Sequence, residues 1–213
     1  MTKIMSKKSS LILNKLNRLY PNPICELAYQ KDYELLIAVV LSNQSTDRRV
    51  NMVTKVLFKQ YPTLNDLKQA DTSELEKIIK PVGTFRRKAL YIKEIATRLV
   101  NQYNGVVPND RQALESLPGV GHKTANVVLS LLFNEPCIAV DTHVARVSKR
   151  LGLVKNNDKV TQIEQKLMTL FDKNDWSKIH YQLVLFGRYH CKAIKPNCVD
   201  CNFKIICQHK KME

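Results

Sequence analysis

Apolar residues recur at helical spacing along most of this chain, while the strict alternation of a half-buried strand is hardly seen. In residues 85–103, for example, Ala89, Ile92, Ala96 and Leu99 would share one face of a helix. Helices are also expected over SLILNKLNRLYPNP, residues 46–61, TLNDLKQA, residues 160–171 and residues 176–189. The pattern therefore predicts an all-α protein.

Two segments add detail to this pattern. DYELLIAVVLSNQ begins at Asp32 and is apolar almost throughout, which suits a buried helix, but its β-branched run IAVV also suits a strand. Further on, Asp71 stands three residues before Glu74 at the start of an apolar run, a spacing that predicts a capping box.

The segment LPGVGHKTANVVLSLLFNEPCIAVD, residues 117–141, holds the densest set of chemical signals. DRQALESL before it and the apolar spacing after its glycines are helical, so the whole predicts helix, glycine-rich hairpin, helix. Gly119 and Gly121 would allow a positive φ or a close backbone approach. The N–H groups of such a turn suit a phosphate, but an ordinary turn with glycine at a helix end fits the same sequence.

Lys123 and Asp141 are the candidate reactive residues of that segment. Lys123 falls in the first turn of the second helix, where the helix dipole disfavours a cation. The position suits an amine that loses its proton and acts as a nucleophile, and a solvated lysine facing phosphate fits equally well. Asp141 stands before THVARVSKRLGL and by itself is expected to cap that helix.

The charge balance favours a polyanionic partner. The chain carries 34 Lys and Arg residues against 19 Asp and Glu residues, a formal net charge of +15. Nucleic acid is the commonest such partner, although ribosomal or membrane-surface binding would give the same charge. No apolar run reaches the roughly 18 residues of a membrane span, and MTKIMSKKSS leads into no signal-peptide core. We expect a bacterial cytoplasmic protein associated with the nucleoid.

The six cysteines divide into two groups. Cys25 and Cys137 stand alone, and free thiols are expected there. The other four form the pattern C-x6-C-x2-C-x5-C near the C-terminus, and clustered cysteines in an intracellular chain indicate a metal site rather than disulfides. Four such thiolates hold zinc or an iron–sulfur cluster, and the spacing alone does not choose. These four are Cys191, Cys198, Cys201 and Cys207.

LPGVGHKTANVVLS followed by AVDTHVARVSKRLGL resembles the helix-hairpin-helix and Gly-Pro-Asp region of the endonuclease III family of DNA glycosylases. The resemblance covers nearly the whole chain. It implies the helix-hairpin-helix DNA glycosylase fold, with two helical lobes and the DNA cleft between them. Residues 25–135 would form a six-helix barrel domain that includes the hairpin. Residues 1–24 plus 136–213 would form an iron–sulfur cluster domain.

The same resemblance implies a bifunctional DNA glycosylase and AP lyase of base excision repair. Such an enzyme removes oxidised pyrimidines from double-stranded DNA and nicks the abasic site by β-elimination through a lysine Schiff base. Lys123 would be the nucleophile and Asp141 the carboxylate that assists it. The cysteine spacing is similar to that of the family's 4Fe–4S site, so the four clustered cysteines would hold a structural 4Fe–4S cluster. A monomer is expected.

The resemblance also assigns DNA contacts. Gln44 would enter the space left by the flipped nucleotide. Thr84 stands where the family often has a leucine wedge, with Phe85 as an alternative wedge, and Asn43 stands where the family more often shows Ala. The remaining expected DNA-binding residues are Gly119, Val120, Gly121, His143, Arg188, Lys192 and Lys195. For the last three, a merely solvated basic loop is the alternative.

Two other functions stay open at this point. A non-catalytic helix-hairpin-helix module with a metal-stabilised tail would bind ordinary duplex DNA without preferring damage. A monofunctional glycosylase, similar to the mismatch adenine glycosylases, would release a base without nicking. Those relatives generally lack a lysine at the position of Lys123 and carry an extra C-terminal domain, so this chain favours the bifunctional reaction.

Overall fold

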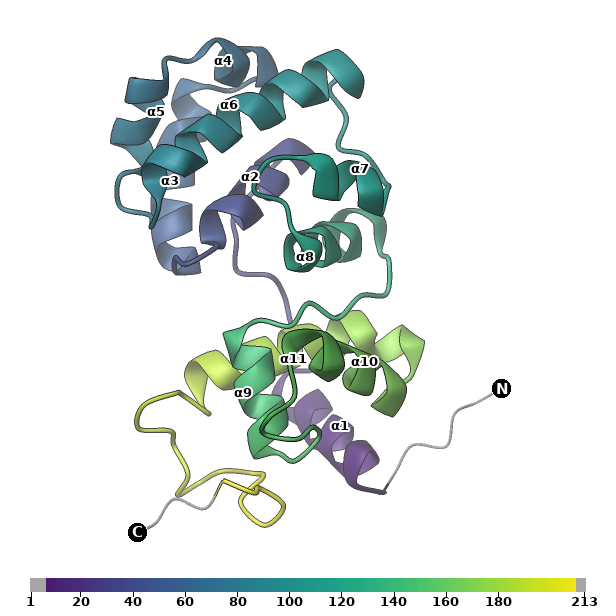
Figure 1. Cartoon of the computed structure of the whole chain (residues 1–213). Helices are drawn as coiled ribbons and strands as arrows, with labels where there is room; N and C mark the ends of the chain where they lie inside the picture. Colours follow the sequence, from purple (N-terminus) through teal and green to yellow (C-terminus); the bar gives the residue numbers. More distant parts are fainter. Residues whose placement is uncertain (1–6, 210–213) are drawn as a thin grey trace. The chain divides into compact units, whose positions relative to one another are not determined.

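The computed structural model describes residues 7–209, and within that range the chain is helical with no strand (Figure 1). The prediction of an all-α protein is therefore confirmed. The helices are α1 (Lys7–Leu19), α2 (Asp32–Ser42), α3 (Asp47–Gln60), α4 (Leu64–Gln69), α5 (Thr72–Ile79), α6 (Phe85–Gln102), α7 (Arg111–Ser116), α8 (His122–Phe133), α9 (Thr142–Arg150), α10 (Val160–Leu170), the short 3-10 helix η1 (Lys173–Asp175) and α11 (Trp176–Tyr189).

The described chain forms two compact units. The first is Glu26–Asn134, and the second joins the described residues up to Cys25 with those from Glu135 onward. The first unit contains seven α-helices, α2 to α8. Their arrangement as a barrel, and the identity of the second unit as an iron–sulfur domain, stay predictions.

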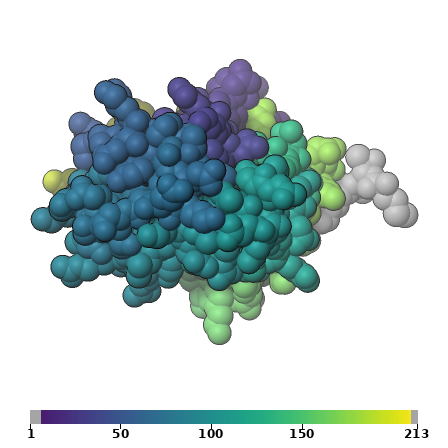
Figure 2. Space-filling view, turned by 90° about the horizontal axis from the view of Figure 1, so that it is seen from above, coloured from purple at the N-terminus to yellow at the C-terminus, as the bar shows by residue number. Residues whose placement is uncertain are grey.

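Helix α2 is the centre of the first unit. Every residue from Tyr33 to Leu41 is buried, Glu34 included, and a helix that is apolar on almost all faces belongs inside a domain. It packs against α3, α6 and α8, while α4 and α5 pack on α6. IAVV, which suited a helix or a strand, therefore lies in a buried helix. In the space-filling view the blue and teal atoms of this unit form a continuous surface (Figure 2).

The second unit is built on α9 and α11, with α1 against α11 and α10 against α9. Gly187 permits the close approach of α11 to α9, because a Cβ there would lie 2.9 Å from the Cβ of His143. The buried Gln182 in α11 donates through Nε2 to Asn17 Oδ1 at 2.9 Å and to the Tyr20 carbonyl at 3.0 Å. These bonds join the N-terminal helix to the C-terminal half of the chain.

The capping box expected at Asp71 forms only in part. The Asp71 carboxylate accepts from the N–H groups of Ser73 and Glu74, which caps α5 as predicted. Glu74, however, accepts from Lys77 Nζ at 2.6 Å one turn later. A complete capping box occurs instead at α4, where Thr63 and Asp66 bond each other's backbone N–H. An (i, i+3) ion pair thus competes successfully for the Glu74 carboxylate.

Candidate active site and cysteine segment

The hairpin between α7 and α8 has the geometry that its glycines predict. Gly119 lies at φ +78°, and a Cβ there would fall 2.5 Å from the Tyr91 ring, so only glycine fits. The Val120 N–H donates to the Leu117 carbonyl at 3.1 Å and closes the turn. Gly121 then begins α8 as its N-cap, in extended conformation and without a side-chain cap. The first N–H groups of α8 therefore lie at the end of the helix that directly follows the hairpin, which is predicted to contact DNA.

Lys123 lies in the first turn of α8 and is half-buried. Its Nζ donates to Asn43 Oδ1 at 3.0 Å, from the loop that follows α2. The Asn43 amide nitrogen faces Thr124 Oγ1 at 3.5 Å. The sequence identified Asn43 only as a departure from the family pattern, and the structure places it in contact with the candidate nucleophile.

Lys88 is a second residue that sequence reasoning missed. Its side chain is buried, with 3 % of the residue exposed, and burial lowers the pKa of its amine to about 8. Nζ donates to the carbonyls of Leu41 and Asn43 at 2.8 and 2.6 Å. The signal was present in the sequence, because residues 85, 88, 89 and 92 share one helical face and Lys88 interrupts its apolar stripe.

Gln44 and Thr84, the two residues expected to enter the duplex, lie on adjoining loops of the first unit. The Gly83 N–H donates to Ser45 Oγ at 2.9 Å, which ties the two loops together. Both Gln44 (φ +59°) and Thr84 (φ +56°) are exposed and adopt the left-handed conformation. That conformation is unfavourable for a β-branched residue, so the fold holds Thr84 in a strained position at the place where the sequence predicts contact with DNA.

Asp141 and His143 lie in the second unit, at the start of α9. Asp141 Oδ1 accepts from the Val144 N–H at 2.7 Å, which confirms the expected N-cap. His143 Nδ1 lies 3.1 Å from Arg146 Nη2, which also donates to the Gly187 carbonyl at 2.7 Å. Because Lys123 belongs to the first unit and Asp141 to the second, their joint action stays a prediction.

Residues 191–207, here called the cysteine segment, are fastened to α9 by two arginines. Arg146 Nε donates to the Cys191 carbonyl at 3.0 Å. Arg150 Nη1 donates to the Lys192 carbonyl at 2.7 Å and to Cys191 Sγ at 3.4 Å. The Cys207 thiol in turn donates to the Arg150 carbonyl at 3.3 Å. Two of the four predicted ligands therefore contact the same arginine.

The four thiols of the cysteine segment influence one another. The pKa of Cys201 is raised, first by burial and then by the nearby Cys191, Cys207 and Cys198. Cys191 and Cys201 also pack against the core of the second unit. Among residues 7–209, no three His, Cys, Asp or Glu side chains converge closely enough to bind one ion. The donor set, four thiols beside a cationic arginine, nevertheless suits an anionic iron–sulfur cluster in kind.

The basic residues predicted beside the cysteines are available to solvent. Lys192 and Lys195 are exposed, and Lys195 has φ +49°. Arg188 lies in the last turn of α11 and is half-exposed.

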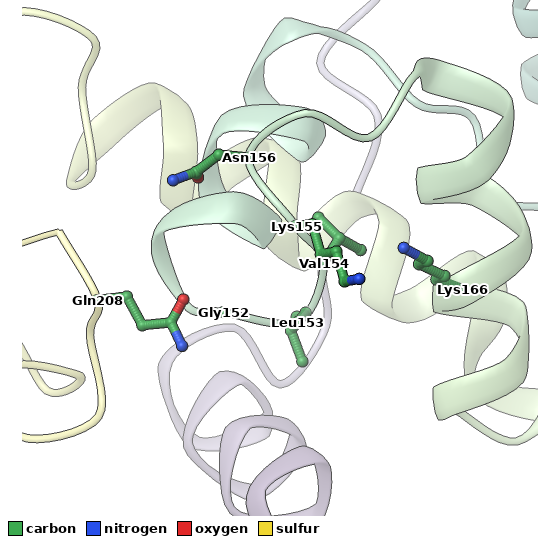
Figure 3. Close-up of a pocket in the computed structure, with 7 residues that line it drawn as sticks. All are labelled: Gly152, Leu153, Val154, Lys155, Asn156, Lys166 and Gln208. Atoms are coloured by element: carbon green, nitrogen blue, oxygen red, sulfur yellow. The ribbon is translucent and has the colours of Figure 1, made fainter.

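A cavity of about 340 Å³ also opens in the second unit, lined in part by Gly152 and Lys166 (Figure 3). None of the predicted site residues lines it.

Comparisons with known proteins show which family the chain belongs to. The family model of the "HhH-GPD superfamily base excision DNA repair protein" matches residues 37–173. Endonuclease III of Bacillus subtilis (strain 168) is 46 % identical over 202 residues, which cover 95 % of this chain and 92 % of the relative. The chain belongs to the endonuclease III family.

Two solved endonuclease III structures extend the similarity to three dimensions. A trapped endonuclease III–DNA covalent intermediate, an estranged-adenine complex, is 47 % identical with a TM-score of 0.90 and covers 96 % of this chain and 97 % of that one. A non-covalent endonuclease III–DNA complex is also 47 % identical, has a TM-score of 0.91 and covers 96 % of each chain. The expected helix-hairpin-helix glycosylase fold is therefore confirmed. Within residues 7–209, no helix is long and apolar enough to cross a membrane.

Proposed function

We propose that this chain is a bifunctional DNA glycosylase and AP lyase of base excision repair, which removes oxidised pyrimidines and nicks the abasic site. One observation carries the proposal. A half-buried lysine lies in the first turn of the helix behind a glycine hairpin, in a chain 47 % identical to an endonuclease III that has been trapped covalently on DNA.

The chemistry follows from the amine of Lys123. An enzyme that acts on a base in a duplex first extrudes the nucleotide from the stack. Nζ attacks the sugar C1′, a C–N bond forms, and the bond from C1′ to the base breaks. Opening of the sugar ring gives a Schiff base, which acidifies the C2′ protons. Loss of one C2′ proton then expels the 3′ phosphate by β-elimination, and water releases the enzyme.

The remaining site residues have distinct parts in this proposal. The Asp141 carboxylate stabilises positive charge on the sugar and assists proton transfer, and its bond to the Val144 N–H holds it rigidly. Gln44 fills the space left by the extruded nucleotide, and Thr84 is the wedge toward the opposite strand. Phosphate contacts come from the backbone of Gly119, Val120 and Gly121 and from the side chains of His143, Arg188, Lys192 and Lys195.

A 4Fe–4S cluster is the proposed cofactor of the second unit. Cys191, Cys198, Cys201 and Cys207 would hold it through their thiolates. When bound, it would cross-link the cysteine segment and so fix the basic loop that carries Lys192 and Lys195. The Arg150 bond to Cys191 Sγ supports this assignment, because a cationic donor favours an anionic ligand set. The expected monomer and the bacterial cytoplasm, with association to the nucleoid, are proposed on the same family basis.

The deciding experiment uses duplexes that contain thymine glycol, an abasic site or undamaged DNA. The bifunctional enzyme should release the oxidised base, nick the abasic strand, and form a covalent adduct under borohydride. Base release without nicking would make the protein a monofunctional glycosylase. Equal binding to all three duplexes, without product, would make it a non-catalytic helix-hairpin-helix module.

A further inference from the structure

The bond between Lys123 and Asn43 fixes the orientation of both side chains. Nζ lies 3.0 Å from Asn43 Oδ1. In this arrangement Nζ donates to the amide oxygen, and the amide nitrogen donates to Thr124 Oγ1 at 3.5 Å. The amide is therefore placed between two residues of the first turn of α8, one of which is the nucleophile.

Asn43 is itself held through its backbone. The buried Lys88 amine donates to the Asn43 carbonyl at 2.6 Å and to the Leu41 carbonyl at 2.8 Å. Ser45 Oγ lies 3.5 Å from the same Nζ. A cation with 3 % exposure that bonds the carbonyls of Leu41 and Asn43, two residues apart, fixes the C-terminal end of α2. The Asn43 side chain therefore projects from a rigid support rather than from a loose loop.

We propose that Asn43 is a positioning residue that orients the Lys123 amine for attack, with Lys88 as the clamp on its backbone. The inference rests on the proposed function, which makes Lys123 the nucleophile. A neutral amine has two N–H groups and one lone pair. Donation of one N–H to Asn43 Oδ1 sets the rotation about the Cε–Nζ bond, so the lone pair points away from the amide and is free to meet a sugar carbon.

The chemistry of an amide suits this positioning role. An asparagine oxygen accepts a hydrogen bond but does not take up a proton near neutral pH, so it holds the amine without acting as a competing base. Lysine has a long flexible stem, and a fixed acceptor restricts it to conformations close to the attacking one. The protonated Schiff base keeps one hydrogen on nitrogen, so the same bond can persist after attack.

The test measures single-turnover borohydride trapping on an abasic duplex across a range of pH, for wild type, Asn43→Ala and Asn43→Asp. Asn43→Ala should slow trapping by about tenfold through loss of one hydrogen bond, with unchanged affinity for a duplex that contains a tetrahydrofuran abasic analogue. Asn43→Asp puts a carboxylate beside the amine and favours its charged form, so the acid limb of its pH–rate profile should move up by about one unit.

The chain offers a matched control. Lys68 Nζ donates to Asn101 Oδ1 at 2.9 Å on the exposed surface of the same unit, so Asn101→Ala removes a lysine–amide bond away from the nucleophile and should leave trapping unchanged. If Asn43→Ala is trapped at the wild-type rate and the pH–rate profile of Asn43→Asp does not move, the positioning role of Asn43 is wrong, while the proposed function stands. If Asn43→Ala does not fold, the nearly isosteric Asn43→Asp decides through its profile. Absence of trapping by wild type would instead remove the proposed function, and this inference with it.

Discussion

Around Lys123, the polar contacts come from the protein's own amide and amine groups, whereas in the cysteine segment four thiols lie among turns. In the first region, Asn43 accepts a hydrogen bond from Lys123 through its side chain and one from Lys88 through its backbone carbonyl. In the second region, the apolar side chains of Ile194, Val199 and Ile205 are 81 %, 78 % and 99 % exposed. The protein's own groups thus complete the region around the nucleophile, whereas for the cysteine segment we propose that a bound cluster supplies the rigidity.

Removal of one thiol from the cysteine segment should have the largest effect on stability. Cys198→Ser should lose iron and the visible absorption of a cluster, and its free energy of unfolding should fall by about 4 kcal/mol or more, as expected when a structural metal site is lost. Iron analysis, absorption spectroscopy and urea unfolding measure these effects. Cys25→Ser, outside the cysteine segment, is the matched control and should keep its iron. A Cys198→Ser protein with full iron content and wild-type stability would contradict the assigned ligand set.

Replacement of Lys88 tests the region around Lys123. Lys88→Met keeps the apolar stem but leaves the carbonyls of Leu41 and Asn43 without their donor. Unsatisfied buried acceptors should lower the free energy of unfolding by about 2 kcal/mol at pH 7. Iron content should not change, because Lys88 lies in the first unit. Wild-type stability of Lys88→Met in urea would show that the clamp contributes nothing.

The pKa of Lys88 determines how the difference in stability between wild type and Lys88→Met changes with pH. Burial lowers this pKa from 10.5 to about 8. Between these values the unfolded chain binds a proton that the native state has released, so wild-type stability should rise with pH in this window. Below pH 8 both states hold the proton and the cost of burying the charge is fully present. The stability gap between wild type and Lys88→Met should therefore widen from pH 7 to pH 10, and a constant or narrowing gap would argue against this titration.

Loss of two surface charges should have the smallest effect. Lys192 and Lys195 are exposed in the cysteine segment, and each phosphate contact contributes about one unit to the slope of log K against log salt concentration. The double variant Lys192→Ala with Lys195→Ala should therefore lower that slope by about 2. A titration of duplex binding against salt measures it, with the exposed Lys77→Ala as the control. An unchanged slope would make this loop a solvated basic surface.

The helices and the hairpin could be predicted because their signals are local. Asp141 caps α9 as its position predicts, and Gly119 adopts the positive φ that its motif requires. The contact between Asn43 and Lys123 could not be predicted, since it joins residues 80 positions apart. Lys88 was missed because a lysine on a helix is usually read as solvated. Glu74 was misassigned because a capping box and an (i, i+3) ion pair compete for the same carboxylate.

The most direct test of the account locates the amine that captures the abasic sugar. Wild-type protein is trapped on an abasic duplex with borohydride, the adduct is digested, and the modified peptide is sequenced by mass spectrometry. The account predicts that the sugar remnant is attached to Lys123, and that Lys123→Gln still binds the duplex but yields no adduct. A remnant on any other amine, or an adduct that persists in Lys123→Gln, would contradict it.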